Sequence, residues 1–366
     1  MKINKKIFDN GLRLVHNEDT STQMVDLNIV YDVGARDEHP EHTGFAHLFE
    51  HLMFGGSVHI PDYDAPLQLA GGENNAWTNN DITNYYLTVP KSNVEIGFWL
   101  ESDRMLELAF SEQSLEVQRA VVMEEFKQRC LNQPYGDVGH LLRPLAYQTH
   151  PYRWPTIGKD LSHIANATLD EVKEFFFRFY APNNAVLAVT GNISWEETKY
   201  FKRSRFDAYY YACDSLSDIL SNGRSSRLTR RLVQEQKLFS SLDAYISGTR
   251  DAGLLHISGK PSAGVSLEQA EAAVRKELEE LKSGFVGEQE LEKVKNKFES
   301  TQIFGNINYL NVATNLAWFE LTGQAEDIDR EVDNYRSVTA EQLHRVAQQT
   351  FRDENGIVLY YQKENL

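Results

Sequence analysis

The chain has 366 residues, more than one domain usually contains, so two domains are expected. Its formal net charge of -16 argues against a nucleic-acid partner, because binding to phosphates requires clustered lysine and arginine side chains. Cys130 and Cys213 are too few and too distant for a disulfide framework, and no stretch is long and apolar enough to span a membrane.

The first half of the chain has the pattern of an α+β unit of about 200 residues. Strands are predicted near residues 6–16 and 24–33, and a helix follows between Thr43, its expected N-cap, and a stop at Gly55-Gly56. The remaining predicted elements are a polar turn and strand within 71–89, helices near 94–109, 115–131 and 169–179, and a strand at 185–190.

The first predicted helix carries His47, Glu50 and His51. Residues 47 and 51 are four apart, so both imidazoles project from one helix face and can share a metal ion, with Glu50 close enough to act on a water molecule. This HxxEH order is the reverse of HExxH, and both orders are typical of two-histidine zinc sites with a general base. The apolar residues form a separate packing face, which consists of Phe45, Leu48, Phe49, Leu52 and Met53. Core histidines would instead be expected singly and on that face, so the pattern favours a metal site.

A catalytic zinc site needs three protein ligands and one open position. The helix predicted at 115–131 offers two adjacent candidates, Glu124 and Glu125, which lie about 100° apart around the helix. Spacing alone does not choose between them.

The second half of the chain repeats this order of elements. Helices are predicted at 209–220 and 226–236, strands near 241–247 and 254–259, charged helices through Leu281 and at 288–302, helices near 312–321 and 340–350, and a final strand at 356–361. When the halves are overlaid, Asp214 falls opposite His47 and Asp218 opposite His51, so one metal site per chain is expected. The predicted domains are residues 1–200, with the metal motif, and 201–366, without it.

Two segments resemble the signature of the pitrilysin-like or inverzincin zinc metallopeptidases, a family that includes the mitochondrial processing peptidase and bacterial homologues. They are Gly34-Ala-Arg-Asp-Glu and the run from Thr43 to Gly56. The resemblance implies an α+β protein of two related α/β-sandwich domains that face each other, each with a mixed or antiparallel sheet covered by helices. Relatives have a longer connector between the domains, which implies that residues are either deleted or omitted near 200–206.

The resemblance also implies roles for individual residues. Aligning Arg119 with the family's Arg-x-Val-x-x-x-Glu stretch makes Glu125 the third zinc ligand, while Gln118 stands where many relatives carry a glutamate. Taken alone, the segment 71–89 is more typical of an ordinary polar hairpin. It resembles the family's substrate-binding edge strand, which implies that Asn75, Ala76 and Thr78 contact the peptide.

The expected function is a zinc-dependent endopeptidase that hydrolyses peptides or unfolded polypeptides. One Zn²⁺ per chain would be held by His47, His51 and Glu125, and Glu50 would act as general base on the zinc-bound water. The alternative is a non-catalytic or partner-dependent subunit of a heterodimeric processing peptidase. A closed four-ligand zinc site is disfavoured because neither cysteine is placed to complete one.

The expected partners are a peptide substrate and a second chain, in a homodimer or in a heterodimer with a related subunit. The amino terminus turns polar at once and lacks the apolar region of a signal peptide. A cytoplasmic location is therefore expected, and a periplasmic one would follow if a signal peptide had been removed.

Overall fold

The computed structural model describes residues 1–198, 208–246, 254–353 and 356–361, which form two compact units. The first comprises Met1–Arg205 and Asn306–Ile328, and the second comprises Phe206–Gly305 and Asp329–Leu366. Both combine helices with strands, which confirms the expected α+β class. The sequence predicted consecutive domains, 1–200 and 201–366, whereas Asn306–Ile328 joins the first unit. The connector expected near 200–206 falls outside the described residues.

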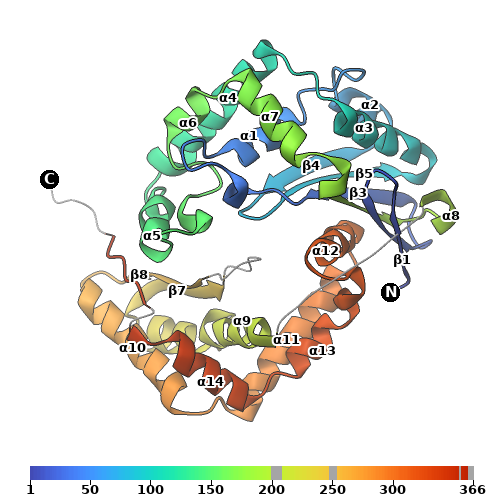
Figure 1. Ribbon diagram of the computed structural model, residues 1–366. Coiled ribbons are helices and arrows are strands. Elements are labelled where there is room, and N and C mark those ends of the chain that lie inside the picture. Colours follow the sequence, from blue (N-terminus) through green and yellow to red (C-terminus); the bar gives the residue numbers. More distant parts are fainter. Residues whose placement is uncertain (199–207, 247–253, 354–355, 362–366) are drawn as a thin grey trace. The chain divides into compact units, whose positions relative to one another are not determined.

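The first unit is built on a mixed six-stranded sheet (Figure 1). Its strands are β1 (Ile3–Ile7), β2 (Arg13–Glu18), β3 (Met24–Tyr31), β4 (Glu73–Thr78), β5 (Thr83–Pro90) and β6 (Ala185–Gly191), in the order β1-β2-β6-β3-β5-β4. Strands β2 and β6 are parallel, and all other neighbours are antiparallel. The single strand predicted near 6–16 is in fact the hairpin β1–β2, because the chain turns at Gly11 with a φ of +88° that glycine readily adopts.

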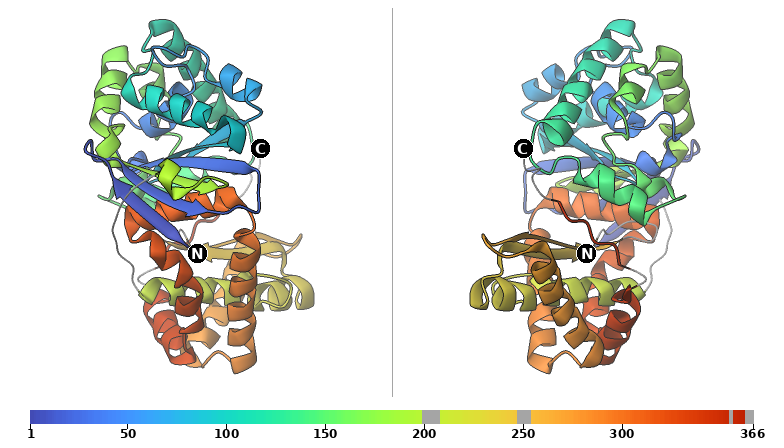
Figure 2. Two further views of the ribbon diagram at one scale, coloured as in Figure 1. Left: turned by 90° about the vertical axis from the view of Figure 1, so that its right-hand side faces the viewer. Right: turned by 90° about the vertical axis from the view of Figure 1, so that its left-hand side faces the viewer.

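Helices cover both faces of this sheet. The helices before the connector are α1 (Phe45–Leu52), α2 (Asp64–Leu69), α3 (Val94–Leu106), α4 (Glu112–Phe126), α5 (Val138–Ala146), α6 (Leu161–Ala165), α7 (Leu169–Phe179) and α8 (Trp195–Thr198). Short 3-10 helices lie at Ala35–Asp37, Lys91–Asn93, Pro151–Arg153, Pro182–Asn184 and Ala325–Asp329. Along β6, Leu187 and Val189 pack into the core shared with α1 and α7, whereas Val186 and Ala188 face α12 (Tyr309–Thr322) on the opposite side (Figures 1 and 2).

The second unit packs helices around a small sheet and has its own core. Its elements are α9 (Ala208–Ser221), the π-helix η6 (Thr229–Glu235), the antiparallel strands β7 (Phe239–Ile246) and β8 (Leu255–Pro261), and the helices α10 (Leu267–Ser283), α11 (Glu288–Gly305), α13 (Glu331–Arg336) and α14 (Ala340–Thr350). The strand predicted at 356–361 is wrong, because this segment pairs with no other described strand and leaves Ile357 and Val358 exposed. In the described part of the chain, no helix is long and apolar enough to cross a membrane.

Candidate metal centre

Helix α1, which carries the histidines, begins at a buried carboxylate. Glu38 accepts hydrogen bonds from the backbone N–H groups of Gly44 and Ala46, both at 2.9 Å. Burial raises the pKa of Glu38 to about 8, although these two N–H donors oppose the shift. Gly44 is the N-cap, with a φ of +91°. Thr43 was predicted for that position. Its hydroxyl instead bonds to the Nδ1 atom of His163 at 2.9 Å and accepts the N–H of Lys159 at 2.8 Å.

The apolar face of α1 anchors the helix to the sheet. The residues predicted for that face, Phe45, Leu48, Phe49, Leu52 and Met53, are all buried. The ring of Phe49 stacks on Phe175 and Tyr180, with centroids 5.1 Å away in both cases. The hydroxyl of Tyr85 on strand β5 donates to the carbonyl oxygen of Phe49 at 3.2 Å. This packing fixes the direction in which the opposite face of α1 points.

Helix α4 supplies the third side chain of the centre. Ser111 caps its start, and Leu115 and Val122 pack into the core that α1 also joins. Glu124 is exposed and hydrogen-bonds to Lys127 at 3.0 Å. Glu125 points toward α1, so the structure separates two neighbours that spacing alone left equivalent.

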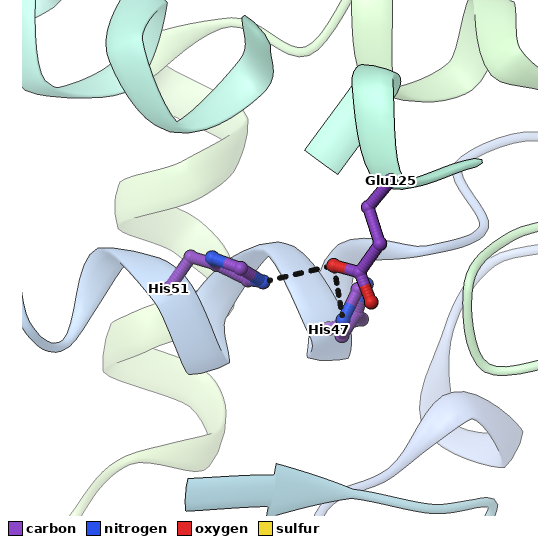
Figure 3. A group of neighbouring side chains, drawn as sticks. All are labelled: His47, His51 and Glu125. Atoms are coloured by element: carbon purple, nitrogen blue, oxygen red, sulfur yellow. Dashed lines mark ion pairs between the residues drawn. The ribbon is translucent and has the colours of Figure 1, made fainter. Parts of the chain in front are cut away.

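His47, His51 and Glu125 converge at one point (Figure 3). The Oε2 atom of Glu125 lies 3.5 Å from Nε2 of His47 and 3.4 Å from Nε2 of His51, and the three ligand atoms all lie within 4.8 Å of one another. Two ligands bound tetrahedrally to zinc at about 2.0–2.2 Å from the ion lie about 3.4 Å apart. The donor set and the two separations from the Glu125 oxygen therefore fit a zinc ion.

The surroundings of His47 also suit metal binding. Burial lowers the pKa of His47 to about 4, which keeps the imidazole neutral near pH 7, the form that binds metal. Its buried Nδ1 atom has no hydrogen-bond partner among the described residues.

Glu50 occupies the same helix between the two histidines, and burial raises the pKa of its carboxyl group. The nearby Thr78 hydroxyl opposes this rise in the pKa of Glu50. The positive charges of His51 and Arg129 oppose it as well. Thr78 ends strand β4, so the candidate general base lies next to the predicted substrate strand.

Strand β4 is the outermost strand of the sheet beyond β5, so one of its edges has no neighbouring strand in the described part of the chain. Asn75, Ala76 and Thr78 all lie on it. The methyl group of Ala76 packs on the core of the α1 layer, and its N–H donates to Oδ1 of Asn75 at 2.8 Å. Their contact with a peptide stays a prediction.

Sequence reasoning assigned no role to two residues at this centre. Glu38 lies within the Gly34-Ala-Arg-Asp-Glu signature, but only the folded chain brings it to the start of α1. Arg129 pairs with Glu125 at 2.6 Å. Its spacing of four residues from that glutamate could have indicated the pair.

Comparison with known proteins agrees with the geometry. Residues 13–158 match the family model "Insulinase (Peptidase family M16)", and residues 200–298 match "Peptidase M16 inactive domain". The chain is 25% identical to the zinc protease PqqE of Helicobacter pylori, over 96% of this chain and 90% of that protein. It is 23% identical to the uncharacterized zinc protease YmxG of Bacillus subtilis, and the match covers 100% of this chain and 99% of that protein.

A crystal structure of a protease from Helicobacter pylori superposes with a TM-score of 0.87 at 25% identity, and the match covers 96% of this chain and 97% of that one. Both halves of the sequence thus match models of M16 peptidases, and the relatives align along nearly their whole length. The chain belongs to the M16 (insulinase or pitrilysin-like) peptidase family.

Proposed function

We propose that this protein is a zinc-dependent endopeptidase that cleaves peptides or unfolded polypeptides. The observation that carries the proposal is the convergence of His47, His51 and Glu125 at separations that suit tetrahedral zinc, with Glu50 on the same helix. Relatives named as zinc proteases that align along nearly the whole chain support the same reaction class.

The residues of the centre would divide into three metal ligands and one general base. When bound, zinc would supply Lewis acidity toward a peptide carbonyl and would lower the pKa of a coordinated water toward about 7. His47, His51 and Glu125 would hold the ion and leave one position open. Glu50 would accept the proton of the attacking water and pass it to the leaving amine.

Strand β4 would hold the substrate. An extended peptide that pairs with the free edge of β4 bonds through its main chain, so many sequences can bind. Thr78 ends this strand beside Glu50, so a bound peptide would run next to the general base. Such pairing needs an extended backbone, which favours unfolded or short substrates over folded ones.

The proposal is tested by cleavage of an unstructured peptide by wild type, by Glu50→Gln and by wild type stripped with a chelator, with bound zinc measured in each. Glu50→Gln is isosteric and leaves the three ligands in place. It should keep its zinc and lose about 10²–10⁴-fold in kcat, the usual contribution of a general base. Chelated protein should be inactive and recover when zinc is restored.

Two outcomes would reject parts of this proposal. If Glu50→Gln kept both zinc and full activity, Glu50 would not be the general base. If wild type held zinc, cleaved nothing alone and became active with a second related chain, the protein would be a partner-dependent subunit of a heterodimeric peptidase.

A further inference from the structure

Arg129 lies one turn after Glu125, in the π-helix η3 (Lys127–Leu131) that continues α4. Its Nη2 atom lies 2.6 Å from Oε1 of Glu125. The other carboxylate oxygen, Oε2, faces Nε2 of both His47 and His51. The two oxygens of one carboxylate therefore have separate partners.

We propose that Arg129 is a positioning residue that fixes the Glu125 carboxylate so that only Oε2 is presented to the metal. This inference rests on the metal centre proposed above. A free glutamate can rotate about its last side-chain bond, and that rotation is broad and roughly two-fold, so its two oxygens would otherwise exchange places. A charge-assisted hydrogen bond to Oε1 restricts that rotation before the ion arrives. Groups that orient metal ligands in this way typically contribute 10–100-fold to affinity.

An opposite effect must be weighed, because a guanidinium near a divalent cation also repels it. The Arg129 side chain is 68% exposed, so the surrounding water weakens this repulsion. The contact with Oε1 is direct and acts at 2.6 Å. Orientation should therefore outweigh repulsion, and removal of Arg129 should weaken zinc binding.

The neighbouring turn offers a matched control. Lys127 lies in the same π-helical segment and pairs with Glu124 at 3.0 Å, and that glutamate side chain is 57% exposed. Lys127→Ala removes the same charge from the same segment without touching Glu125. An effect of Arg129→Ala that Lys127→Ala does not share comes from the position of Arg129 beside the centre, where its charge also acts on His47 and Glu50. A double-mutant cycle isolates the contact with Glu125.

The experiment measures the zinc dissociation constant by competition with a chelator in the full chain, for wild type, Arg129→Ala, Arg129→Lys and Lys127→Ala. Circular dichroism and thermal melting check that each variant is folded. Arg129→Ala should bind zinc about 10-fold or more weakly, Arg129→Lys should recover part of the loss, and Lys127→Ala should match wild type. The visible spectrum of the cobalt-substituted protein should change in Arg129→Ala and stay that of wild type in Lys127→Ala.

A double-mutant cycle separates positioning from a general charge effect. In a Glu125→Ala background, Arg129→Ala should change zinc affinity no further, because the group that it positions is gone. The inference is overturned if Arg129→Ala binds zinc as tightly as wild type. It is also overturned if Arg129→Ala lowers zinc affinity by the same factor in wild type and in Glu125→Ala.

These measurements, together with the peptide-cleavage assay, distinguish this inference from the proposed function. If wild type binds zinc and Arg129→Ala binds it weakly, but no peptide is cleaved, the peptidase proposal fails and the positioning role stands. If wild type binds no zinc, both fail.

Discussion

Glu124 and Glu125 are chemically identical neighbours with opposite surroundings. The Glu124 side chain is 57% exposed and pairs with Lys127, whereas that of Glu125 is 21% exposed and faces both histidines. Successive side chains on a helix point about 100° apart. Here Glu124 therefore points to solvent, whereas Glu125 points to the candidate metal centre. The packing of Leu115 and Val122 against the core determines which of the two points inward.

Substitution of each glutamate by glutamine tests this difference. Glu125→Gln should weaken zinc binding by about 100-fold or more, since losing a direct ligand should cost at least as much as losing an outer partner. Glu124→Gln should leave zinc affinity within about twofold of wild type, as expected for an exposed surface charge. Isothermal titration of zinc into chelator-treated protein measures both. Zinc loss in Glu124→Gln with retention in Glu125→Gln would contradict the assignment.

Among the elements, the sequence predicted α7 and α14 well because both are bounded by local chemistry. Thr168 with Glu171 and Thr339 with Gln342 form capping boxes that mark where these helices start. The two histidines of α1 could also be predicted from neighbouring residues alone, because a spacing of four residues places both on one helix face.

Other features depend on residues that are distant in the chain. Thr43 has the chemistry of an N-cap, but His163 and Lys159 compete for its hydroxyl, and Glu38 satisfies the start of α1 instead. The segment 356–361 has a strand-like composition, yet a strand also needs a partner. The choice of Glu125 over Glu124 likewise came from resemblance and then from tertiary packing, not from periodicity.

Helix α9 shows what replaces the histidines in the second unit. Asp214 and Asp218 occupy the positions overlaid on His47 and His51, and burial raises the pKa of both carboxyl groups. Asp214 accepts a hydrogen bond from the Tyr335 hydroxyl at 2.5 Å. Glu331 on α13 adds a third acid, and burial together with the charge of Asp214 raises its pKa to about 7.

This acidic group predicts a pH-dependent stability. A carboxyl group with a raised pKa in the folded state favours folding below its unfolded pKa of about 4.5, and that contribution is lost as pH rises through about 7. Glu331→Gln stays neutral, so it should be more stable than wild type by about 1–3 kcal/mol at pH 8 and nearly equal at pH 4. Urea unfolding followed at several pH values measures the difference. A gap between the two proteins that is the same at pH 4 and pH 8 would reject this explanation.

At the scale of the whole molecule, the chain leaves the second unit after α11, contributes α12 to the first unit, and returns at α13. Helix α12 buries Ala313, Leu316 and Ala317 against the sheet face that carries Val30 and Val186. Its Glu320 is fully buried and pairs with Lys5 of strand β1 at 2.6 Å. The first unit, which carries the candidate metal centre, is therefore incomplete without a helix from the second half of the sequence.

A fragment of residues 1–205 should consequently fold poorly, although it holds every candidate zinc ligand. Without α12 it would expose the apolar face of the sheet to water and lose the ion pair between Lys5 and Glu320. Expected results are low solubility, binding of a hydrophobic dye and weak zinc affinity. Adding a peptide of residues 306–328 should restore solubility and zinc binding, whereas the same peptide with Leu316→Asp should not, because it would bury a charge in the restored core. If the fragment alone bound zinc with the affinity of the full chain, α12 would be dispensable for the metal centre.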